Sequence, residues 1–348
     1  MVDTMSLLRA LLRSARRTRS ALRHGDGPQA GDEVLLDAPD ERLAPALVAA
    51  GRGEYGPAAK LLATTREAAG WEERDRYVRR LAAFARSRPD WVEEWHANAP
   101  GDPDALLLRA QLAVDRCWAS PARAELLAEV GPLVVAATGA DPLDPVPWRI
   151  ALEHACGTRA GHTEFERLWT EAVRRAAHHY GCHVAALRYL AAVWQGSHGE
   201  CFDFAESAAQ DAPPGALVQA LPAHAAFTCL VRGAEVPRER LDAAADRAIA
   251  LSARYPAADP WPAEVRNLLA YVLVCLDRRQ DALDQLHLIG PYATSFPWDR
   301  VTDDPLGLFL RLREELPAGA GRPTPDGLIP SPRRPRIEDG GHTTAGDH

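Results

Sequence analysis

The stretch from residue 147 to 214 constrains the fold most, because its apolar residues recur at the spacing of amphipathic helices. Trp148, Leu152 and Ala155 lie on one helical face, and a glycine-containing break at residues 157–161 ends that pattern. A second apolar stripe follows, formed by Phe165, Leu168, Trp169, Ala172, Val173 and Ala176. We therefore expect a helical hairpin over these residues.

The pattern then repeats once more. The third stripe consists of Val184, Leu187, Leu190, Ala191 and Trp194, and the fourth of Phe202, Ala205 and Ala209. Gly196 and Ser197 separate the two stripes, and Pro213 and Pro214 end the second hairpin. The hairpins therefore recur at about the 34 residues of a short helix–turn–helix repeat.

Length and residue pattern extend this interpretation to most of the chain. With 348 residues, of which 47% are hydrophobic, the chain can bury a large core. Almost no segment alternates β-branched and polar residues, so we expect little or no sheet. The predicted fold is all-α, with antiparallel helical hairpins stacked as one solenoid rather than gathered into two compact domains.

Two hairpins resemble the tetratricopeptide repeat. Gly53–Tyr55 forms the turn of the first hairpin, with Ala46 before it and Ala58 after it. In that family a small residue in each helix lets the pair pack closely, and Ala46 and Ala58 fit those two positions. Ala270 and Ala282 repeat the same offset near the other end of the chain. The resemblance implies a tetratricopeptide-like α-solenoid.

A second resemblance lies in the central stretch. The segments Trp194–His198 and Phe202–Ala205, followed by Ala212–Gly215, are similar to a pattern in uncharacterised helical-repeat proteins of GC-rich actinobacteria. The likeness covers about residues 140–315 and implies a fold without an activity. Lys60 is the only lysine among 40 basic residues, which fits a GC-rich coding bias, so we give the arginine content no functional weight.

We expect three parts along the chain. Residues 1–31 form a basic amphipathic segment and a linker, and residues 32–317 form the repeat array. A proline-rich break near residues 141–147 leaves a subdivision of the array open. Residues 318–348 are rich in Pro, Gly, Arg and Asp, and we expect them to be disordered. Residues 5–23 could contact a membrane surface, an acidic partner or RNA, or form a solvated terminal helix.

Charge and cysteine content restrict the function classes. A formal net charge of -8 argues against general nucleic-acid binding, because phosphate contacts require a clustered basic surface. No apolar run approaches the roughly 18 residues of a membrane span. The six cysteines lie in or beside predicted helices with no export signal before them. We therefore expect free thiols and a cytoplasmic protein.

Histidine and cysteine spacing raises the question of a metal site. His179 and Cys182 are followed by His198 and Cys201 with the spacing of a zinc site, but an intervening helix would separate the two pairs by about 20 Å. A second set, Cys156, His162, His198 and Cys201, falls near turns at one end of the predicted helices. The alternative is that these cysteines fill core gaps and the histidines cap helices, so no metal or cofactor is assigned.

Other clusters carry two interpretations each. His178 and His179 follow Arg174 and Arg175 at a predicted helix end, where cations favour the helix dipole, or they could bind an anion. Carboxylate pairs could perform hydrolysis or form a wet helix face; they are Glu164, Glu166, Glu171, Glu200 and Asp203. Aromatic residues could cradle a ligand or pack between repeats; they are Trp169, Trp194 and Phe202.

The leading functional hypothesis is a non-catalytic protein–protein interaction scaffold that binds a peptide or partner segment on the concave face of the array. Arg149, His183 and Arg188 are the candidate contact residues, which would orient an acidic or C-terminal segment. The alternative is a small-molecule or metal-dependent activity within residues 148–204. The chain has no G-x-x-x-x-G-K-[ST], G-x-S-x-G or H-E-x-x-H motif, and no G-x-G-x-x-G after a predicted strand. The absence of these motifs argues against the enzyme classes that carry them.

Overall fold

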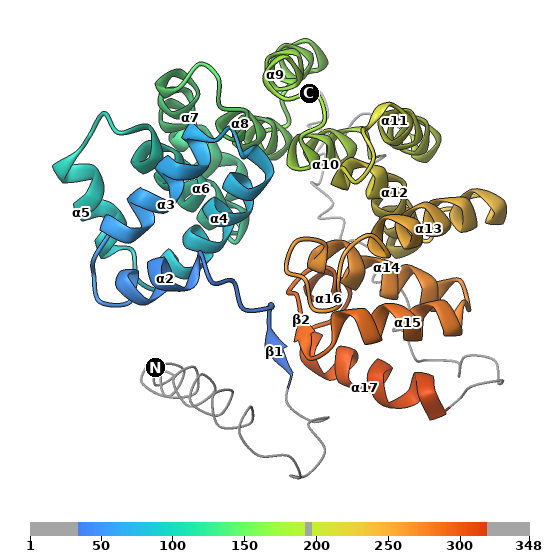
Figure 1. Ribbon diagram of the computed structural model, residues 1–348. Coiled ribbons are helices and arrows are strands. Elements are labelled where there is room, and N and C mark those ends of the chain that lie inside the picture. The colour runs from blue at the N-terminus through green and yellow to red at the C-terminus, as the bar shows by residue number, and fades with distance from the viewer. Residues whose placement is uncertain (1–33, 192–196, 319–348) are drawn as a thin grey trace, which may run out of the picture. The chain divides into compact units, whose positions relative to one another are not determined.

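The protein is all-α, as a computed structural model that describes residues 34–191 and 197–318 shows (Figure 1). The first eight helices are α2 (Ala44–Ala50), α3 (Gly56–Glu67), α4 (Trp71–Ala85), α5 (Asp90–Asn98), α6 (Pro103–Trp118), α7 (Arg123–Ala140), α8 (Val146–Gly157) and α9 (His162–Arg175). The others are α10 (Tyr180–Leu190), α11 (His198–Asp211), α12 (Leu221–Arg232), α13 (Arg238–Ser252), α14 (Ala263–Cys275), α15 (Arg279–Ile289), α16 (Trp298–Val301) and α17 (Pro305–Ala318), with a short 3₁₀ helix at Leu217–Ala220.

Sheet is almost absent from the described ranges, as expected. The sheet found there has two strands of two residues each, β1 (Leu35–Leu36) and β2 (Tyr292–Ala293). The predicted basic segment at residues 5–23, the predicted disordered tail beyond Ala318, and Trp194 lie outside the described residues.

The chain divides into two compact units, Met1–Leu35 and Leu36–His348. Helices α2 to α17 all belong to the second unit. The proline-rich break at residues 141–147 joins α7 to α8 within this unit, and those two helices pack directly on each other.

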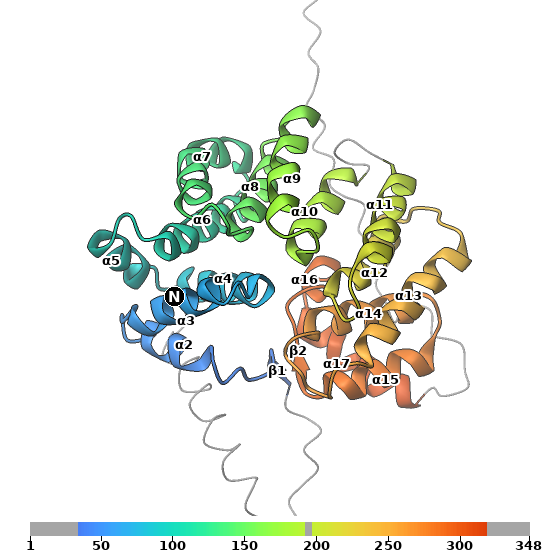
Figure 2. The ribbon, with the colours of Figure 1, turned by 45° about the horizontal axis from the view of Figure 1, so that its top comes forward.

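Alternate helices of the second unit pack in a row. Helix α4 contacts α6, and the same relationship continues through α8, α10, α12 and α14 (Figures 1 and 2). We call these six helices the central row. Helices α7, α9, α11, α13 and α15 each pack on the central-row helix that precedes them in the chain. One helix of each successive pair therefore lies in the central row.

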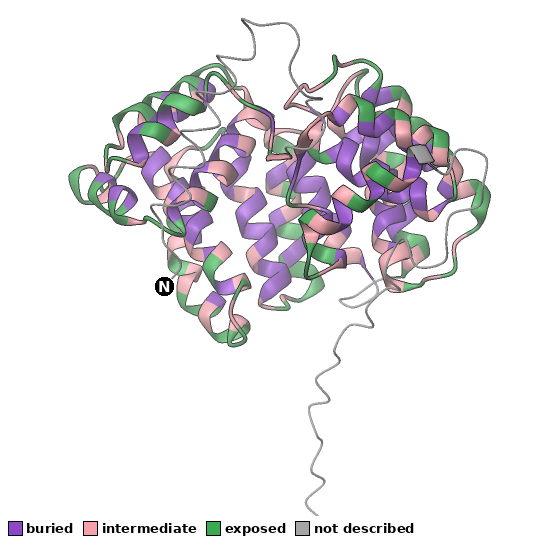
Figure 3. Ribbon diagram, turned by 90° about the horizontal axis from the view of Figure 1, so that it is seen from below, coloured by how far each residue is buried: buried purple, intermediate pink, exposed green. Residues whose placement is uncertain are grey.

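Small residues let the paired helices approach closely. Ala46 and Ala58 are buried between α2 and α3, and Ala270 and Ala282 are buried between α14 and α15. Gly157, at the end of α8, marks a closer approach, since a Cβ atom there would lie 2.2 Å from Cδ1 of Leu127. Buried positions follow one side of outer helices such as α9, whereas the central-row helices α10 and α14 are buried on nearly all sides (Figure 3).

Buried arginines also tie the core together. The guanidinium of Arg74 is fully buried, and it donates hydrogen bonds to Asp104 (2.6 Å), Asp144 (2.7 Å) and the carbonyl oxygen of Leu62 (2.8 Å). Asp144 lies in the proline-rich break and also accepts the backbone N–H of Val146 at 2.8 Å. This break therefore anchors α8 to α4 through charge-assisted hydrogen bonds.

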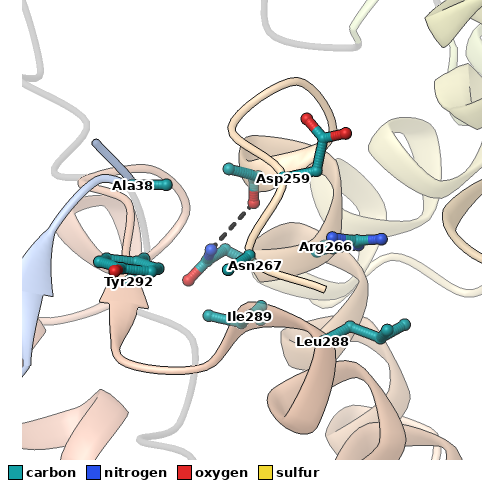
Figure 4. A pocket seen from close by; sticks show the side chains of 9 residues that line it. Ala38, Asp259, Arg266, Asn267, Leu288, Ile289 and Tyr292 are labelled. Atoms are coloured by element: carbon teal, nitrogen blue, oxygen red, sulfur yellow. Dashed lines mark hydrogen bonds between the residues drawn. The ribbon is translucent and has the colours of Figure 1, made fainter. Parts of the chain in front are cut away.

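The other end of the described chain has its own polar anchor. Asn267 on α14 accepts the indole N–H of Trp298 at 2.9 Å and donates to the carbonyl oxygen of Ala263 at 2.9 Å. Beside it lies a cavity of about 10 Å³, bordered by Ala38, Asp259 and Tyr292 among others (Figure 4). That volume suits at most one water molecule, so the cavity is a packing feature and no ligand site.

Candidate functional site

One face of α4 gathers the charged residues from which the site is built. Glu72, Asp75 and Arg79 lie on that face, because positions three and four apart in a helix are neighbours. Val78, Leu81 and other apolar side chains of α4 fill the core on its remaining sides. The charged face is turned toward α8 and α10, which both contact α4.

A buried ion pair joins this face to α8. Nη2 of Arg149 lies 2.6 Å from Oδ1 of Asp75, and Nη1 of Arg149 donates to Glu153 at 2.8 Å. Burial alone would raise the pKa of Asp75, but Arg149 and Arg79 outweigh it and hold that pKa at about 2. Both carboxylates therefore stay ionised around Arg149.

A second contact holds the start of α10. Glu72 accepts the backbone N–H of Tyr180 at 2.5 Å, which satisfies a donor that the helix itself leaves free. The next residue, Gly181, leaves room for α4: a Cβ atom at that position would lie 2.5 Å from Oδ2 of Asp75. Close approach to Asp75 therefore requires glycine here.

His179 caps the same helix end. Its Nδ1 accepts the backbone N–H of Cys182 at 3.2 Å, and its Nε2 lies 4.0 Å from Oδ2 of Asp75. The sequence predicts that His179 interacts with the dipole at the C-terminal end of α9. In the structure His179 instead caps the N-terminus of α10.

A more accessible surface continues from this buried network, and we call it the mixed-charge surface. Its members come from five helices of the central row and all carry charged, titratable or aromatic side chains: Arg79, Asp115, Trp118, Arg188, His224 and Glu264. Glu264 is exposed and the other five are half-buried. Helix α4 contacts α10, α10 contacts α12, and α12 contacts α14, so these members follow one another along the central row.

Arg79 connects the network to this surface. Its Nε lies 3.4 Å from Oδ2 of Asp75, and its Nη2 lies 3.8 Å from Oε1 of Glu153. The side chain is 36% exposed, so part of the guanidinium faces outward. Burial opposes the charge, but Asp75, Glu153 and Glu264 together raise the pKa of Arg79. This arginine is therefore already neutralised from inside the protein.

Arg188 differs from Arg79, because it has no ion pair or hydrogen bond with any residue that the structure describes. Its guanidinium lies 5.7 Å from the ring centre of Trp118, a cation–π contact that orients it without neutralising it. Arg123 lies over the same ring at 4.8 Å. The positive charge of Arg188 is thus available to an incoming anion.

A tyrosine and a histidine extend the surface toward α12. The hydroxyl of Tyr180 lies 3.4 Å from Nδ1 of His224, and the His224 ring stacks on Phe296 with centres 5.2 Å apart. Burial, together with Arg188 and Arg79, lowers the pKa of His224 to about 3. The imidazole is therefore neutral at physiological pH, and it offers a flat ring rather than a charge.

The three partner-binding candidates predicted from the sequence have different environments. Arg149 is fully buried and occupied by Asp75 and Glu153, so it supports the surface from beneath. His183 is buried as well, with its Nδ1 2.9 Å from the carbonyl oxygen of His179 and its ring 5.0 Å from that of Trp169. Of the three, Arg188 alone is partly exposed.

The four metal-ligand candidates are not assembled. Among residues 34–191 and 197–318 no group of three or more His, Cys, Asp or Glu side chains is arranged to hold a metal ion. Cys156 and Cys201 are buried and their thiols point at the carbonyl oxygens of Ala185 (3.6 Å) and Leu187 (3.9 Å). His162 is exposed and begins α9, and His198 begins α11. All six cysteines are free thiols, as the sequence indicated.

The carboxylate pairs lie mostly on wet helix faces. Glu164 pairs with Arg167 at 2.7 Å, and Glu171 pairs with Arg174 at 2.7 Å. Glu200 closes a capping box with Ser197 at the start of α11. The aromatic candidates pack internally: Phe202 is fully buried, and the Trp169 ring lies 5.6 Å from that of Phe204.

Sequence reasoning missed the residues of α4 and α14. Glu72, Asp75 and Arg79 have the spacing of a solvated helix face, so the sequence gave no local signal that Asp75 is buried. Glu264 likewise looks like an acidic residue in the first turn of a helix, where acids are common.

Comparison with known proteins adds no relative. No protein-family model, no curated protein and no solved structure matches this chain. The resemblances to tetratricopeptide repeats and to the actinobacterial pattern therefore stay predictions. None of the helices in the described part of the chain combines the length and apolarity needed to cross a bilayer.

Proposed function

We propose that this protein is a non-catalytic scaffold that binds a segment of a partner protein on the mixed-charge surface, with Arg188 as the main contact. The observation that carries the proposal is that Arg188 is half-buried, oriented by Trp118, and unpaired within the described residues. A guanidinium in such a site gains most from a carboxylate of the partner, through charge-assisted hydrogen bonds.

The surroundings favour a segment over a single ion. Side chains of five central-row helices contribute, and the rings of Trp118 and His224 provide apolar area next to the charge. Helical hairpins whose inner helices form one continuous wall commonly receive an extended or helical segment there. An acidic residue with apolar neighbours would complement this wall.

The burial of Cys156, Cys201 and His183 favours binding over the alternative of an enzymatic activity in residues 148–204. Burial raises the pKa of Cys156 to about 12 and that of Cys201 to about 11, so neither thiol is a ready nucleophile. Burial lowers the pKa of His183 to about 4, which removes it as a base of suitable strength at neutral pH. The pKa values of these two thiols and this imidazole therefore lie away from neutral pH, where acid–base catalysis operates best.

Selection from a random dodecapeptide display library tests the proposal with the full chain as target. We expect enriched peptides that place an acidic residue beside apolar ones. The Arg188→Gln variant should bind such a peptide about 10-fold more weakly, as expected for loss of a partly desolvated charge pair.

Arg52→Gln is the matched control, because Arg52 is an exposed arginine outside the mixed-charge surface. If the selection enriches no peptide family over background, the proposed function is wrong. If the Arg188→Gln and Arg52→Gln variants bind the peptide equally well, Arg188 is not a contact residue.

A further inference from the structure

Arg188 shares the ring of Trp118 with a second arginine. The guanidinium carbon of Arg123 lies 4.8 Å from the centre of that ring, and the guanidinium carbon of Arg188 lies 5.7 Å from it. Trp118 ends α6, Arg123 begins α7, and Arg188 lies in the last turn of α10. We call these three residues the two-arginine cluster.

The indole gives both arginines a common support. Trp118 packs against the end of α8, since a Cβ atom at Gly157 would lie 3.1 Å from its Cζ2. The two guanidiniums cannot be farther apart than the sum of their distances from the ring centre. All three side chains of the cluster are half-buried, so part of each remains accessible. One group with several acceptor oxygens can therefore contact both arginines after small side-chain rotations.

Neither arginine of the cluster is neutralised by the residues that the structure describes, because neither has a hydrogen bond or ion pair with them. Arg175 provides the comparison. Its guanidinium also lies over an indole, 4.3 Å from the ring centre of Trp148, but it is paired with Glu171 at 2.7 Å. A contact with tryptophan thus leaves an arginine free to pair, and the cluster lacks the carboxylate that Arg175 has.

The nearest acidic residues along the chain and on α8 are turned elsewhere. Glu153 on α8 is held by Arg149 at 2.8 Å and by Arg79 at 3.8 Å. Glu125 follows Arg123 by two positions, and side chains two positions apart in a helix do not face each other. The cluster therefore presents two positive charges to an incoming ligand.

We infer that the acidic group of the bound segment is a phosphorylated side chain, held by Arg123 and Arg188 together. This inference rests on the proposed function and names the partner chemistry of the same site: a phosphopeptide. A phosphoserine carries a charge of about −1.5 to −2 at neutral pH and three acceptor oxygens. It matches two guanidiniums, whereas a single carboxylate leaves one of them unmatched.

Three peptide libraries that differ in one fixed central residue test this inference: phosphoserine, glutamate or serine. The other positions are degenerate, and the full chain is immobilised. We expect the phosphoserine library to be retained about 10-fold more strongly than the glutamate library, and the serine library least. A phosphoserine peptide recovered in this way and its glutamate counterpart then serve as the two probes.

Single substitutions separate the two arginines. Arg123→Gln should weaken binding of the phosphoserine peptide about 10-fold and leave binding of the glutamate peptide nearly unchanged, whereas Arg188→Gln should weaken both. Arg52→Gln is the control, because Arg52 is exposed and lies outside the cluster. Both cluster variants should keep the wild-type circular dichroism spectrum, since neither arginine forms a hydrogen bond within the described residues.

The outcomes separate this inference from the proposed function. If both probes bind equally well and Arg188→Gln weakens both, the phosphopeptide inference is wrong and the proposed function stands. The same holds if Arg123→Gln leaves the preference for phosphoserine unchanged. If no library is retained above background, both proposals are wrong.

Discussion

Arg149 and Asp75 are 74 positions apart in the chain, yet Nη2 of Arg149 lies 2.6 Å from Oδ1 of Asp75 in the interior. The guanidinium is fully buried and Glu153 lies on its other side at 2.8 Å. This contact fixes α8 against α4, and together with Gly181 it also fixes the start of α10. The mixed-charge surface depends on that arrangement, because its members Arg79 and Arg188 lie on α4 and α10.

Replacing Arg149 by methionine should be strongly destabilising. The change leaves Asp75 and Glu153 buried without their main cation, and breaking such a pair costs about 3–5 kcal/mol. Urea unfolding at neutral pH measures the loss in the free energy of unfolding. Arg167→Met is the control, since Arg167 forms an exposed pair with Glu164 that contributes at most about 0.5 kcal/mol. Similar losses in the two variants would show that the buried pair contributes little.

Gly181→Ala tests the close approach of α10 to α4. The new Cβ would lie 2.5 Å from Oδ2 of Asp75 and 3.2 Å from Nη2 of Arg79, so the helices must separate or the ion pair must shift. We expect a loss of about 1–3 kcal/mol, as for overpacking in a core. Gly199→Ala is the matched change in α11, where the nearest atom is Oγ of Ser197 at 3.6 Å. That variant should gain a few tenths of a kcal/mol from helix propensity, and a loss there as large as at Gly181 would contradict the steric account.

The helices could be predicted from the sequence, because burial of one helix face makes apolar residues recur every three to four positions. The stripes beginning at Trp148 and Phe165 correspond to α8 and α9, and the break at residues 157–161 lies between them. The helix predicted through Trp194 is shorter in the structure. Ala191 leaves the helical conformation with φ -60° and ψ 139°, so α10 ends at Leu190.

The candidate site was only partly readable, because ion pairs such as Asp75–Arg149 join residues far apart in sequence. A charged residue in an amphipathic pattern is expected to face water, and only tertiary packing shows that Arg149 is buried. Arg188 is partly exposed in the structure, and its role as a contact residue stays a prediction. Glu264 was not predicted, because the sequence does not show that α14 packs on α12 in the central row.

The cysteines give a chemical test of the packing. Five of the six thiols are buried and Cys275 is half-buried. Burial raises the pKa of Cys275 to about 12. In the native protein at pH 8 we expect reaction with a disulfide reagent such as DTNB to be slow at all six positions, because few thiolates form and access is restricted. After unfolding in guanidinium all six should react quickly. Fast native labelling at Cys156 or Cys201, identified by mass spectrometry, would contradict the buried positions assigned to them.

His183 should make stability depend on pH below neutrality. Its folded-state pKa of about 4 lies below the ordinary value of 6.5, so between these values the unfolded chain binds a proton that the native protein excludes. Stability is therefore fully present above about pH 6.5 and is lost as the pH falls toward 4. At pH 5 the loss from this one group is about 2 kcal/mol relative to pH 7.5. In His183→Phe, which retains an aromatic ring beside Trp169 and Phe204, the free energy of unfolding should fall about 2 kcal/mol less over the same interval. Urea titrations of both proteins at the two pH values measure the difference, and parallel losses would show that His183 is already protonated, or exposed, in the native state.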